Sequence, residues 1–544
     1  MNIQLLWILV IVYLGIVAYL GYLGYSKTKE EKDYLIAGGE VNPFVLAMSY
    51  GATFISTSAI VGFGGVAGLF GMSLLWLTFL NIFVGIFLAF AVFGKRTLLM
   101  GRNLGSYTLP EFLGQRYQSR FIQGFTATQI FIILPVYTAA VLIGGARFME
   151  GVLNIDYTIA VMVLSAIVAA YVMYGGLRGV VYTDAFQASL MFIFMLIMLV
   201  TTYVKLGGIV PAHQALTNLA DMVPESLAAG GHRGWTAMPK FASPLWWTQV
   251  STIILGVGIG VLAQPQLVVR YLTVKSPKQI NRAVLMGGVF IVMMTGVAFI
   301  VGPLSNVWFV QETGKIAVAS VPGGNVDLII PAFIKSIMPE WFSYLFLLAM
   351  LAAAMSTLSS QFHVQGTSLT HDLYKGCYGK GKEVKNSLLI NRLGILIALV
   401  AVVWLSFSLP PGIIAIATAF FFGTCAVTFL PIYFGALYWK GATRTGAIAS
   451  LVTGAATVLF LLLFVHAKEA TAVGLVQVLL GKPALFGFPW TVVDPLIIGL
   501  PISSLVFIVV SLLTQSMEQS HVQTCFNSIS KEENSIKSDN AETI

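Results

Sequence analysis

Long stretches without any charged residue dominate this chain. Its first charge is Lys27, so residues 1–26 form one uncharged, largely apolar run. Of the 544 residues, 57% are hydrophobic and only 10% are charged, whereas soluble domains carry about a quarter charged residues. A chain of this composition cannot cover a water-exposed surface with polar groups. The sequence therefore excludes a water-soluble enzyme and predicts a polytopic domain that lies in the lipid bilayer.

Charges and Pro/Gly clusters separate thirteen apolar stretches, each long enough to cross a membrane as a helix. Residues 1–26 lack a basic start and a small-residue cleavage site, which indicates a retained first helix rather than a signal peptide. We therefore expect an all-α membrane protein. The predicted spans are 4–25, 44–70, 72–93, 121–148, 158–176, 184–206, 246–268, 284–309, 341–366, 388–408, 412–438, 445–466 and 491–514.

Basic residues are distributed unevenly between alternate loops. The loops that begin after the first helix and alternate from there hold 22 Lys and Arg residues, and the opposite set holds eight. Because cytoplasmic loops are enriched in Lys and Arg, we expect a multi-pass cell-membrane protein with its amino terminus outside and its carboxyl terminus in the cytoplasm. The net charge of +8 reflects this topology, since no basic run interleaved with aromatic residues indicates nucleic-acid binding.

Metal and catalytic constellations are not apparent in the sequence. Cys377, Cys425 and Cys525 are far apart and form no CxxC motif, so they predict neither a disulfide framework nor a cysteine metal site. An intramembrane enzyme would need an acid, a base or a metal group, and paired histidines or carboxylates within the spans are missing. We therefore expect no enzyme activity and no cofactor.

The spans group into two bundles of five helices, 44–206 and 246–440, that enter the membrane from opposite sides. Each bundle opens with a glycine-rich segment, Gly51 to Gly68 in the first and Gly256 to Gly260 in the second. Glycine-interrupted helices in corresponding places of two inverted halves indicate a transporter site, because unwound backbone can bind ions there. The alternative is that these glycines only allow close helix packing.

The remaining parts are an amino-terminal extra helix and loop (1–43), an extracellular loop (207–245), two carboxyl-terminal helices (441–515) and a polar cytoplasmic tail (516–544) that we expect to be disordered.

The predicted span 341–366 carries a polar stripe. Ala353, Ser356, Thr357, Ser360 and His363 follow at intervals of three and four, so they share one helical face. Neutral oxygens without a fixed carboxylate suit a monovalent cation that must bind and then leave. The alternative is that the hydroxyls bond to their own helix or join neighbouring helices, and that the lone histidine is structural.

The second predicted span contains the run Tyr50-Gly51-Ala52-Thr53-Phe54-Ile55-Ser56-Thr57-Ser58. Small, hydroxylated and β-branched residues in mid-membrane favour a break in the helix. The carbonyls freed by a break could bind a cation, and the positive end of the following half-helix could bind a substrate anion.

Further motifs occur in order along the chain. They are Gly144 to Arg147, Tyr174 to Asp184 with Gln187, Gln264-Pro265 with Arg270, Met355 to Ser360 with His371 to Tyr374, and Val493 to Pro495. Taken together, these motifs resemble those of the sodium:solute symporters, over nearly the whole chain. The resemblance implies a five-plus-five inverted-repeat core of the LeuT type and sodium-driven symport of a small solute by alternating access, with sodium as the only metal.

The resemblance also implies cation sites. The implied sodium ligands are the backbone carbonyls of Ala52, Ile55 and Ala353 and the hydroxyls of Ser356 and Thr357. A possible second cation would be held by Asp184, Ser359 and Ser360. Asp184 begins the predicted span 184–206, so the alternative is a solvated charge at a helix start.

The substrate prediction combines the resemblance with the physics of the predicted break. Proline transporters of this family carry aromatic residues where this chain has Val257 and Val261, and an acidic residue where it has Phe54. A site without a buried carboxylate offers little to an ammonium group, whereas half-helix amino termini suit a carboxylate. We therefore expect a monocarboxylate or related organic acid. The alternatives are a proline-like amino acid, pantothenate, a proton-coupled version, or a passive channel or facilitator. The candidate substrate residues are Thr53, Phe54, Ser56, Tyr137, Gln129, Gln249, Val257, Val261, Gln264 and Gln361.

Overall fold

Helices account for nearly all of the regular structure in the computed structural model, which describes residues 3–153, 155–378 and 387–541. Eleven single helices in these ranges are long and apolar enough to cross a membrane, and the bent pair Pro43–Phe54 and Ser58–Phe70 adds a twelfth span. The shorter apolar helix Tyr157–Ala170 corresponds to the predicted span 158–176. Each of the thirteen predicted apolar stretches therefore corresponds to a helix, and the prediction of an all-α membrane protein is confirmed.

The first predicted bundle folds as a run of helices interrupted by short 3-10 or π segments, which carry η labels. Its elements are α3 (Pro43–Phe54), η2 (Ser58–Gly62), α4 (Phe63–Phe70), η3 (Met72–Leu74), α5 (Leu75–Ile82), η4 (Phe83–Gly94), α6 (Lys95–Leu104), α7 (Leu109–Arg116), α8 (Arg120–Leu153) and α9 (Tyr157–Lys205).

The second predicted bundle has the same character. Its elements are α12 (Pro244–Trp247), η6 (Thr248–Gly256), α13 (Val257–Gly260), η7 (Val261–Ala263), α14 (Pro265–Leu272), α15 (Pro277–Ile291), η8 (Val292–Gly296), α16 (Val297–Thr313), η9 (Ala317–Ser320), η10 (Pro322–Gly324), η11 (Val326–Leu328), α17 (Ile329–Ile337), α18 (Glu340–Thr367), η12 (Ser368–Tyr378), α19 (Ser387–Ser408) and α20 (Ile414–Tyr438).

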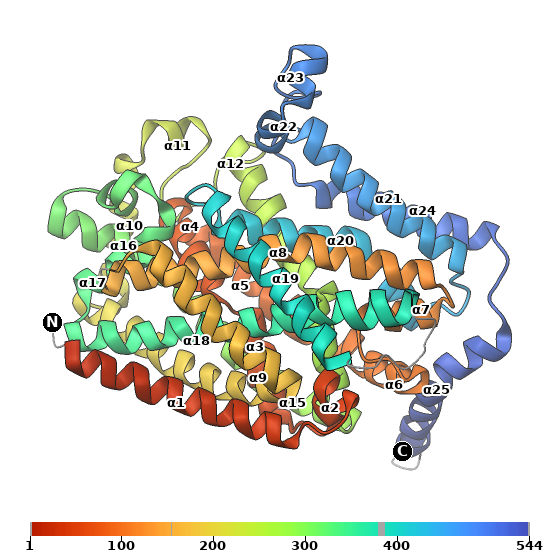
Figure 1. Cartoon of the computed structure of the whole chain (residues 1–544). Coiled ribbons are helices and arrows are strands. Elements are labelled where there is room, and N and C mark those ends of the chain that lie inside the picture. The colour runs from red at the N-terminus through yellow and green to blue at the C-terminus, as the bar shows by residue number, and fades with distance from the viewer. Residues whose placement is uncertain (1–2, 154, 379–386, 542–544) are drawn as a thin grey trace.

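The remaining helices flank these bundles or cap their ends. They are α1 (Ile3–Lys27), α2 (Glu31–Ile36), η1 (Ala37–Gly39), α10 (Ile209–Asn218), η5 (Ala220–Met222), α11 (Glu225–Ala229), α21 (Arg444–Phe460), η13 (Leu461–Val465), α22 (Ala467–Val473), α23 (Leu475–Leu480), α24 (Pro495–Leu513) and α25 (Gln519–Ala541). Figure 1 shows α10, α11 and α17 at one end of the long helices and α2, α6 and α25 at the other. We call these ends the α10 face and the α6 face.

α3 and α4 are two halves of one broken span. Asn42 caps the start of α3, because its side chain accepts a hydrogen bond from the Val45 N–H at 2.9 Å, and Pro43 occupies the first turn. α3 ends at Phe54, and Ile55 is extended with φ −93° and ψ 103°. The chain then restarts as a helix at Ser58, bent by 53°. The break predicted from the Thr/Ser-rich run is therefore present.

The second glycine-rich segment is also interrupted. Gln264 leaves the helical conformation with φ −75° and ψ 124°, and Pro265 begins α14. This follows from the rule that the residue before a proline is pushed out of the helical region. α14 continues to Leu272, beyond residue 268 where the span was predicted to end, so Arg270 lies inside the helix rather than in a loop.

Asp184 does not start a helix. α9 runs from Tyr157 to Lys205 and kinks at Gly176, whose φ of 55° and ψ of −163° are open to glycine alone. Asp184 lies two turns beyond the kink and is fully buried. The alternative interpretation of Asp184 as a solvated amino-terminal charge is therefore wrong, because the helix bends instead of ending.

The tail beyond residue 516 is helical rather than disordered up to Ala541, and residues 542–544 lie outside the described residues. α25 packs on α6, where the Asn103 side-chain amide donates to the Cys525 carbonyl at 3.1 Å. Cys525, Phe526 and Ile529 are buried in this contact. The expectation of disorder rested on average polarity, whereas these three apolar residues share one face of the helix.

The Gly176 kink gives a test of this fold. A Cβ atom at position 176 would lie 2.5 Å from Cδ2 of Tyr34, in a backbone conformation that other residues avoid. We expect Gly176→Ala to lower the stability of the purified protein by about 1–3 kcal/mol, seen as a lower Tm in detergent. Gly15→Ala is the control, because nothing lies within 4 Å of that Cβ position. An equal Tm for the two variants would contradict the assigned kink.

Candidate functional site

The break in the first span brings a free carbonyl against α18. Because Ser56 is not part of a helix, the Ala52 carbonyl has no N–H four residues later to bond with. It accepts instead from the hydroxyls of Ser356 at 3.0 Å and Thr357 at 3.1 Å. Ser356 Oγ also lies 3.2 Å from the Ala353 carbonyl oxygen. All these residues are buried.

The oxygen cluster matches four of the five predicted sodium ligands, Ala52, Ala353, Ser356 and Thr357. The fifth, Ile55, is the extended residue at the break itself. Calcium, which is close to sodium in size, binds oxygens at about 2.3–2.6 Å, so neighbouring ligands lie about 3.3–3.7 Å apart. The contacts here span 3.0 to 3.2 Å, so a small outward shift would give the spacing that such an ion needs.

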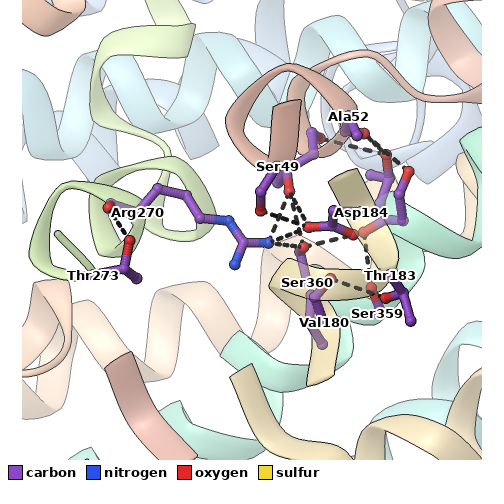
Figure 2. Close-up of polar contacts among 12 residues, drawn as sticks. Ser49, Ala52, Val180, Thr183, Asp184, Arg270, Thr273, Ser359 and Ser360 are labelled. Carbon is purple, nitrogen blue, oxygen red and sulfur yellow. Dashed lines mark hydrogen bonds and ion pairs between the residues drawn. The ribbon is translucent and has the colours of Figure 1, made fainter. Parts of the chain in front are cut away.

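A second buried polar cluster lies one turn further along α18, as Figure 2 shows. Asp184 Oδ2 accepts from Ser49 Oγ at 2.8 Å and from Arg270 Nη2 at 2.9 Å. Arg270 Nη2 also lies 2.9 Å from Thr53 Oγ1 and 2.5 Å from Ser360 Oγ. The cluster therefore joins α3, α9, α14 and α18 around one fully buried ion pair.

The predicted second cation set is only partly assembled here. Asp184 and Ser360 meet through Arg270, whereas the Ser359 hydroxyl donates to the Ser356 carbonyl of its own helix at 2.8 Å. Arg270 was singled out in the sequence only as part of a motif. Its place in this cluster was missed because the predicted span ended before it.

A small cavity lies beside the break, between α3, η2, α4, α5, α8, α13, η8, α16 and α20. Four predicted substrate residues line it, namely Phe54, Ser56, Tyr137 and Val257. The cavity has a volume of about 20 Å³, which is space for about one water molecule. The side chains thus close around this position, and a solute needs the cavity to widen.

The other six candidate substrate residues lie elsewhere. Thr53 belongs to the Asp184 cluster, and the Gln249 side chain donates to Ser73 Oγ at 2.5 Å. Val261 packs 3.4 Å from the Cβ position of Gly85, and the Gln264 Oε1 atom accepts from Gln266 at 2.5 Å. The structure places Gln129 in α8 and Gln361 in α18, both outside the cavity lining.

Three polar residues of the cavity lining were not predicted, Asn81, Thr295 and Thr418. Asn81 gave a usable signal, since a lone amide within a lipid-length apolar span indicates a functional position. The two threonines gave none, because their hydroxyls bond to the carbonyls of Ile291 and Ile414 one turn earlier, as threonines do throughout membrane helices.

Comparisons with known proteins agree with this geometry. A model of the sodium:solute symporter family matches residues 34–454. The chain belongs to the sodium:solute symporter family. It is 28% identical over 471 residues to sodium/proline symporter 2 of Staphylococcus saprophyticus, covering 84% of this chain and 86% of that protein. It is 27% identical over 450 residues to the osmoregulated proline transporter OpuE of Bacillus subtilis, covering 81% and 85%.

The fold of this symporter also matches a solved structure, the substrate-bound outward-open state of a Na+-coupled sialic acid symporter. The TM-score is 0.72 at 18% sequence identity, over 94% of this chain and 98% of that chain. This likeness confirms the inverted-repeat fold of the LeuT type. The matching family and the relatives above are transporters.

Close contacts join distant elements at the α10 face. The carbonyl of Gly68, in α4, accepts from Trp235 Nε1 at 2.9 Å and from the Asn306 side chain at 2.8 Å. Next to it, a Cβ atom on Gly65 would lie 2.1 Å from the Val326 carbonyl oxygen, so only glycine allows α4 and η11 to approach this closely. The buried Asp327 in η11 accepts from the Gly412 N–H at 2.9 Å, which ties η11 to the turn before α20.

Close contacts join distant elements at the α6 face as well. The Val41 N–H donates to the Thr273 carbonyl at 2.9 Å, which joins the start of α3 to the end of α14. Glu31 of α2 contacts His371 Nδ1 at 3.1 Å and Lys375 Nζ at 2.6 Å, both in η12. The hydrogen bond from His371 is the main cause that lowers the pKa of Glu31 to about 2. These contacts join elements of the two bundles and their flanking helices at both faces.

The contacts of Ala52 generate the first test at this site. Ser356→Ala and Thr357→Ala each remove one hydroxyl from the oxygen cluster, and we expect each to raise the sodium concentration for half-maximal uptake by about tenfold, equivalent to about 1.4 kcal/mol. Thr202→Ala is the control, because that buried hydroxyl bonds only to the Met198 carbonyl of its own helix. The measurement is labelled-solute uptake into proteoliposomes at equal protein content. Unchanged sodium dependence in both variants would refute these ligands.

Asp327 gives a pH-dependent test at the α10 face. Burial raises the pKa of its carboxyl group to about 6 from the ordinary 3.8, so the folded protein carries an unfavourable buried charge above pH 6. As the pH falls from about 7 towards 4, the folded state becomes more stable, and the folding equilibrium constant rises by about tenfold or more. We expect Asp327→Asn, which keeps an acceptor for Gly412, to flatten this slope of Tm against pH between 4 and 7. An identical slope in the variant would show that Asp327 is not responsible.

Proposed function

We propose that this chain couples inward transport of a small solute to sodium through the oxygens of Ala52, Ile55, Ala353, Ser356 and Thr357. One observation carries the proposal: the Ala52 carbonyl, released by the break after α3, lies against two hydroxyls of α18. A sodium ion inserted there would bind α3 and α18 together. Because α3 and α18 belong to different bundles, the ion would favour one relative placement of the two bundles over another.

Proline is the first candidate solute. The two relatives compared by sequence above, which cover most of the chain, are named as proline transporters. The break after Phe54 supports a zwitterion on physical grounds, because it offers two opposite partial charges at one point. The carbonyl end of α3 is negative and suits an ammonium group, and the amino-terminal end of the next helix is positive and suits a carboxylate.

A monocarboxylate is the second candidate. It is favoured by the cavity lining, in which Ser56, Asn81, Tyr137, Thr295 and Thr418 are the polar members and no acidic side chain takes part in the lining described. An ammonium group would have no carboxylate partner there, whereas a carboxylate could use hydroxyl and amide donors.

The energetics separate the two candidates. One sodium ion that falls through about 100 mV releases about 2.3 kcal/mol, and a tenfold sodium gradient adds about 1.4 kcal/mol. A zwitterion has no net charge and can use the whole sum, which corresponds to several-hundred-fold accumulation. A monoanion carries a charge that cancels the electrical part, so symport with one sodium ion supports only about tenfold accumulation.

We also propose that the protein lies in the cell membrane with the α6 face in the cytoplasm. The support is the count from the sequence, in which the loops predicted to be cytoplasmic hold 22 Lys and Arg residues, Arg270 among them, against eight in the opposite set. The amino terminus would then lie outside and the carboxyl terminus, with α25, inside.

The test is uptake of labelled proline, lactate and acetate by proteoliposomes that contain the purified protein, each with and without an inward sodium gradient. We expect proline to accumulate only with the sodium gradient, by at least about a hundredfold when the interior is negative. Accumulation of a monocarboxylate instead would select the second candidate. Flux that ignores sodium would indicate a facilitator, and uptake driven by a pH gradient without sodium would indicate proton coupling; either result would contradict the proposal.

A further inference from the structure

The connection between the last two spans is long, and it lies at the edge of the bilayer. α21 and η13 together form a span of 22 residues, 444–465, which is about 33 Å of helix and enough to cross the hydrocarbon core of a bilayer. Arg444, at the start of α21, donates to the carbonyl of Tyr117, which follows α7 at the α6 face. The connection 466–494 therefore begins at the opposite edge of the hydrocarbon core, on the side of the α10 face.

Residues 466–491 of this connection form a structured hairpin, which we call the α22–α23 hairpin. Two backbone hydrogen bonds fix its base. The Leu485 N–H donates to the Phe464 carbonyl at 2.7 Å, and the Ala467 N–H donates to the Thr491 carbonyl at 3.0 Å. Both helices pack on η13, and Figure 1 shows them projecting from the body of the molecule beyond the end of α21. The hairpin therefore presents its outer residues in a fixed direction.

The outer end of the hairpin is apolar and exposed. Val478 is 84% exposed, Leu479 67% and Leu480 56%, and these three residues follow one another at the end of α23. Water-exposed protein surfaces rarely carry a contiguous apolar patch, because such side chains are more stable out of water. The patch therefore indicates contact with an apolar partner. The exposed aromatic residues of the returning segment are Phe486, Phe488 and Trp490.

The surroundings of the patch favour lipid as that partner. The patch continues the exposed apolar surface of α21, where Leu459 and Phe460 are 58% and 45% exposed directly before η13. Trp490 is of the residue type that collects at the boundary between lipid and water. Lys482 lies two residues beyond the patch, and a lysine can keep its ammonium group in water while its carbon chain lies along apolar groups. A soluble partner would account for the patch but not for its continuity with the membrane-facing side of α21.

We propose that the α22–α23 hairpin is a membrane anchor, which inserts Val478, Leu479 and Leu480 among the acyl chains of the leaflet at the α10 face. Lys482 then lies at the level of the lipid headgroups. Because the hairpin joins α21 to α24, its insertion fixes the depth of both spans, which hydrophobic length alone leaves free to tilt. The anchor lies away from the oxygen cluster and the cavity, so the proposal does not depend on the ion or the solute.

The experiment measures which medium surrounds a spin label on the hairpin. Val478→Cys and Leu479→Cys are each labelled in the full-length protein that also carries Cys377→Ser, because Cys377 is partly exposed whereas the other two cysteines are buried. The proteins are placed in vesicles of phosphatidylethanolamine and phosphatidylglycerol. Electron paramagnetic resonance then compares collisions of the label with oxygen, which concentrates among acyl chains, and with a water-soluble nickel complex present on both sides. We expect both labels to collide more with oxygen.

Three further labelled positions give the reference values. Leu505→Cys reports the lipid-facing side of α24, where Leu505 is 62% exposed. Glu225→Cys reports water at the α10 face, because Glu225 is an exposed residue of α11. Lys482→Cys is the matched control within the hairpin, and its ratio of oxygen to nickel collisions should lie between those two values.

The ratio at the patch decides the question. We expect the ratio at Val478 and Leu479 to exceed the ratio at Lys482 and to approach the ratio at Leu505. A ratio no higher than that at Lys482 would show that the patch does not enter the acyl chains. Few collisions with either reagent would show that protein covers the patch, as in a dimer of this chain. Either of these results would overturn the proposal and leave the proposed transport function untouched.

Discussion

The contact between one released carbonyl and two hydroxyls organises the centre of this molecule. A helix that ends in mid-membrane leaves carbonyl groups that no water can satisfy, so the break after Phe54 is stable only because α18 supplies Ser356 and Thr357 to Ala52. That requirement fixes how α3 lies on α18, and with it the positions of the cavity and of the Asp184 cluster. The same contact can change when an ion binds, because a hydroxyl that donates to a carbonyl can rotate and coordinate a cation through its oxygen.

Charge is confined to one place in this centre. Asp184 and Arg270 are almost completely buried, and they neutralise each other across α9 and α14. The cavity beside the break is lined by neutral side chains alone. A net-neutral solute would thus face neutral groups, while the charged pair lies about one turn away. This separation allows the solute and the ion to be recognised by different residues and still be linked through the short α3 segment that contacts both.

Hydropathy was sufficient to predict the architecture, because every span must satisfy its backbone internally and therefore appears as an apolar stretch of known length. The break at Ile55 and Ser56 and the one at Gln264 were also predictable, the first from small, hydroxylated and β-branched residues and the second from proline. The position of Arg270 in the buried cluster was not predictable, because a basic residue near the end of a span is taken to mark a loop, and its burial depends on where α14 ends.

Thr295 and Thr418 were not predicted for a different reason. Their local hydrogen bonds are those of any membrane threonine, and only the packing of α16 and α20 brings them to the cavity. Disorder of the tail was wrongly expected, since three apolar residues on one face outweigh low average hydropathy.

The extended residue before α14 has a consequence for the energetics of a membrane that carries a voltage. Arg270 lies on the short helix α14, which follows the extended residue Gln264, and its charge never leaves the protein. Any displacement of that helix along the membrane normal moves a full positive charge through part of the electric field, which amounts to a fraction of about 2.3 kcal/mol per 100 mV. The resting potential then acts on the protein itself, biasing the step in which the unloaded carrier reorients, in addition to its pull on the ions that the carrier binds.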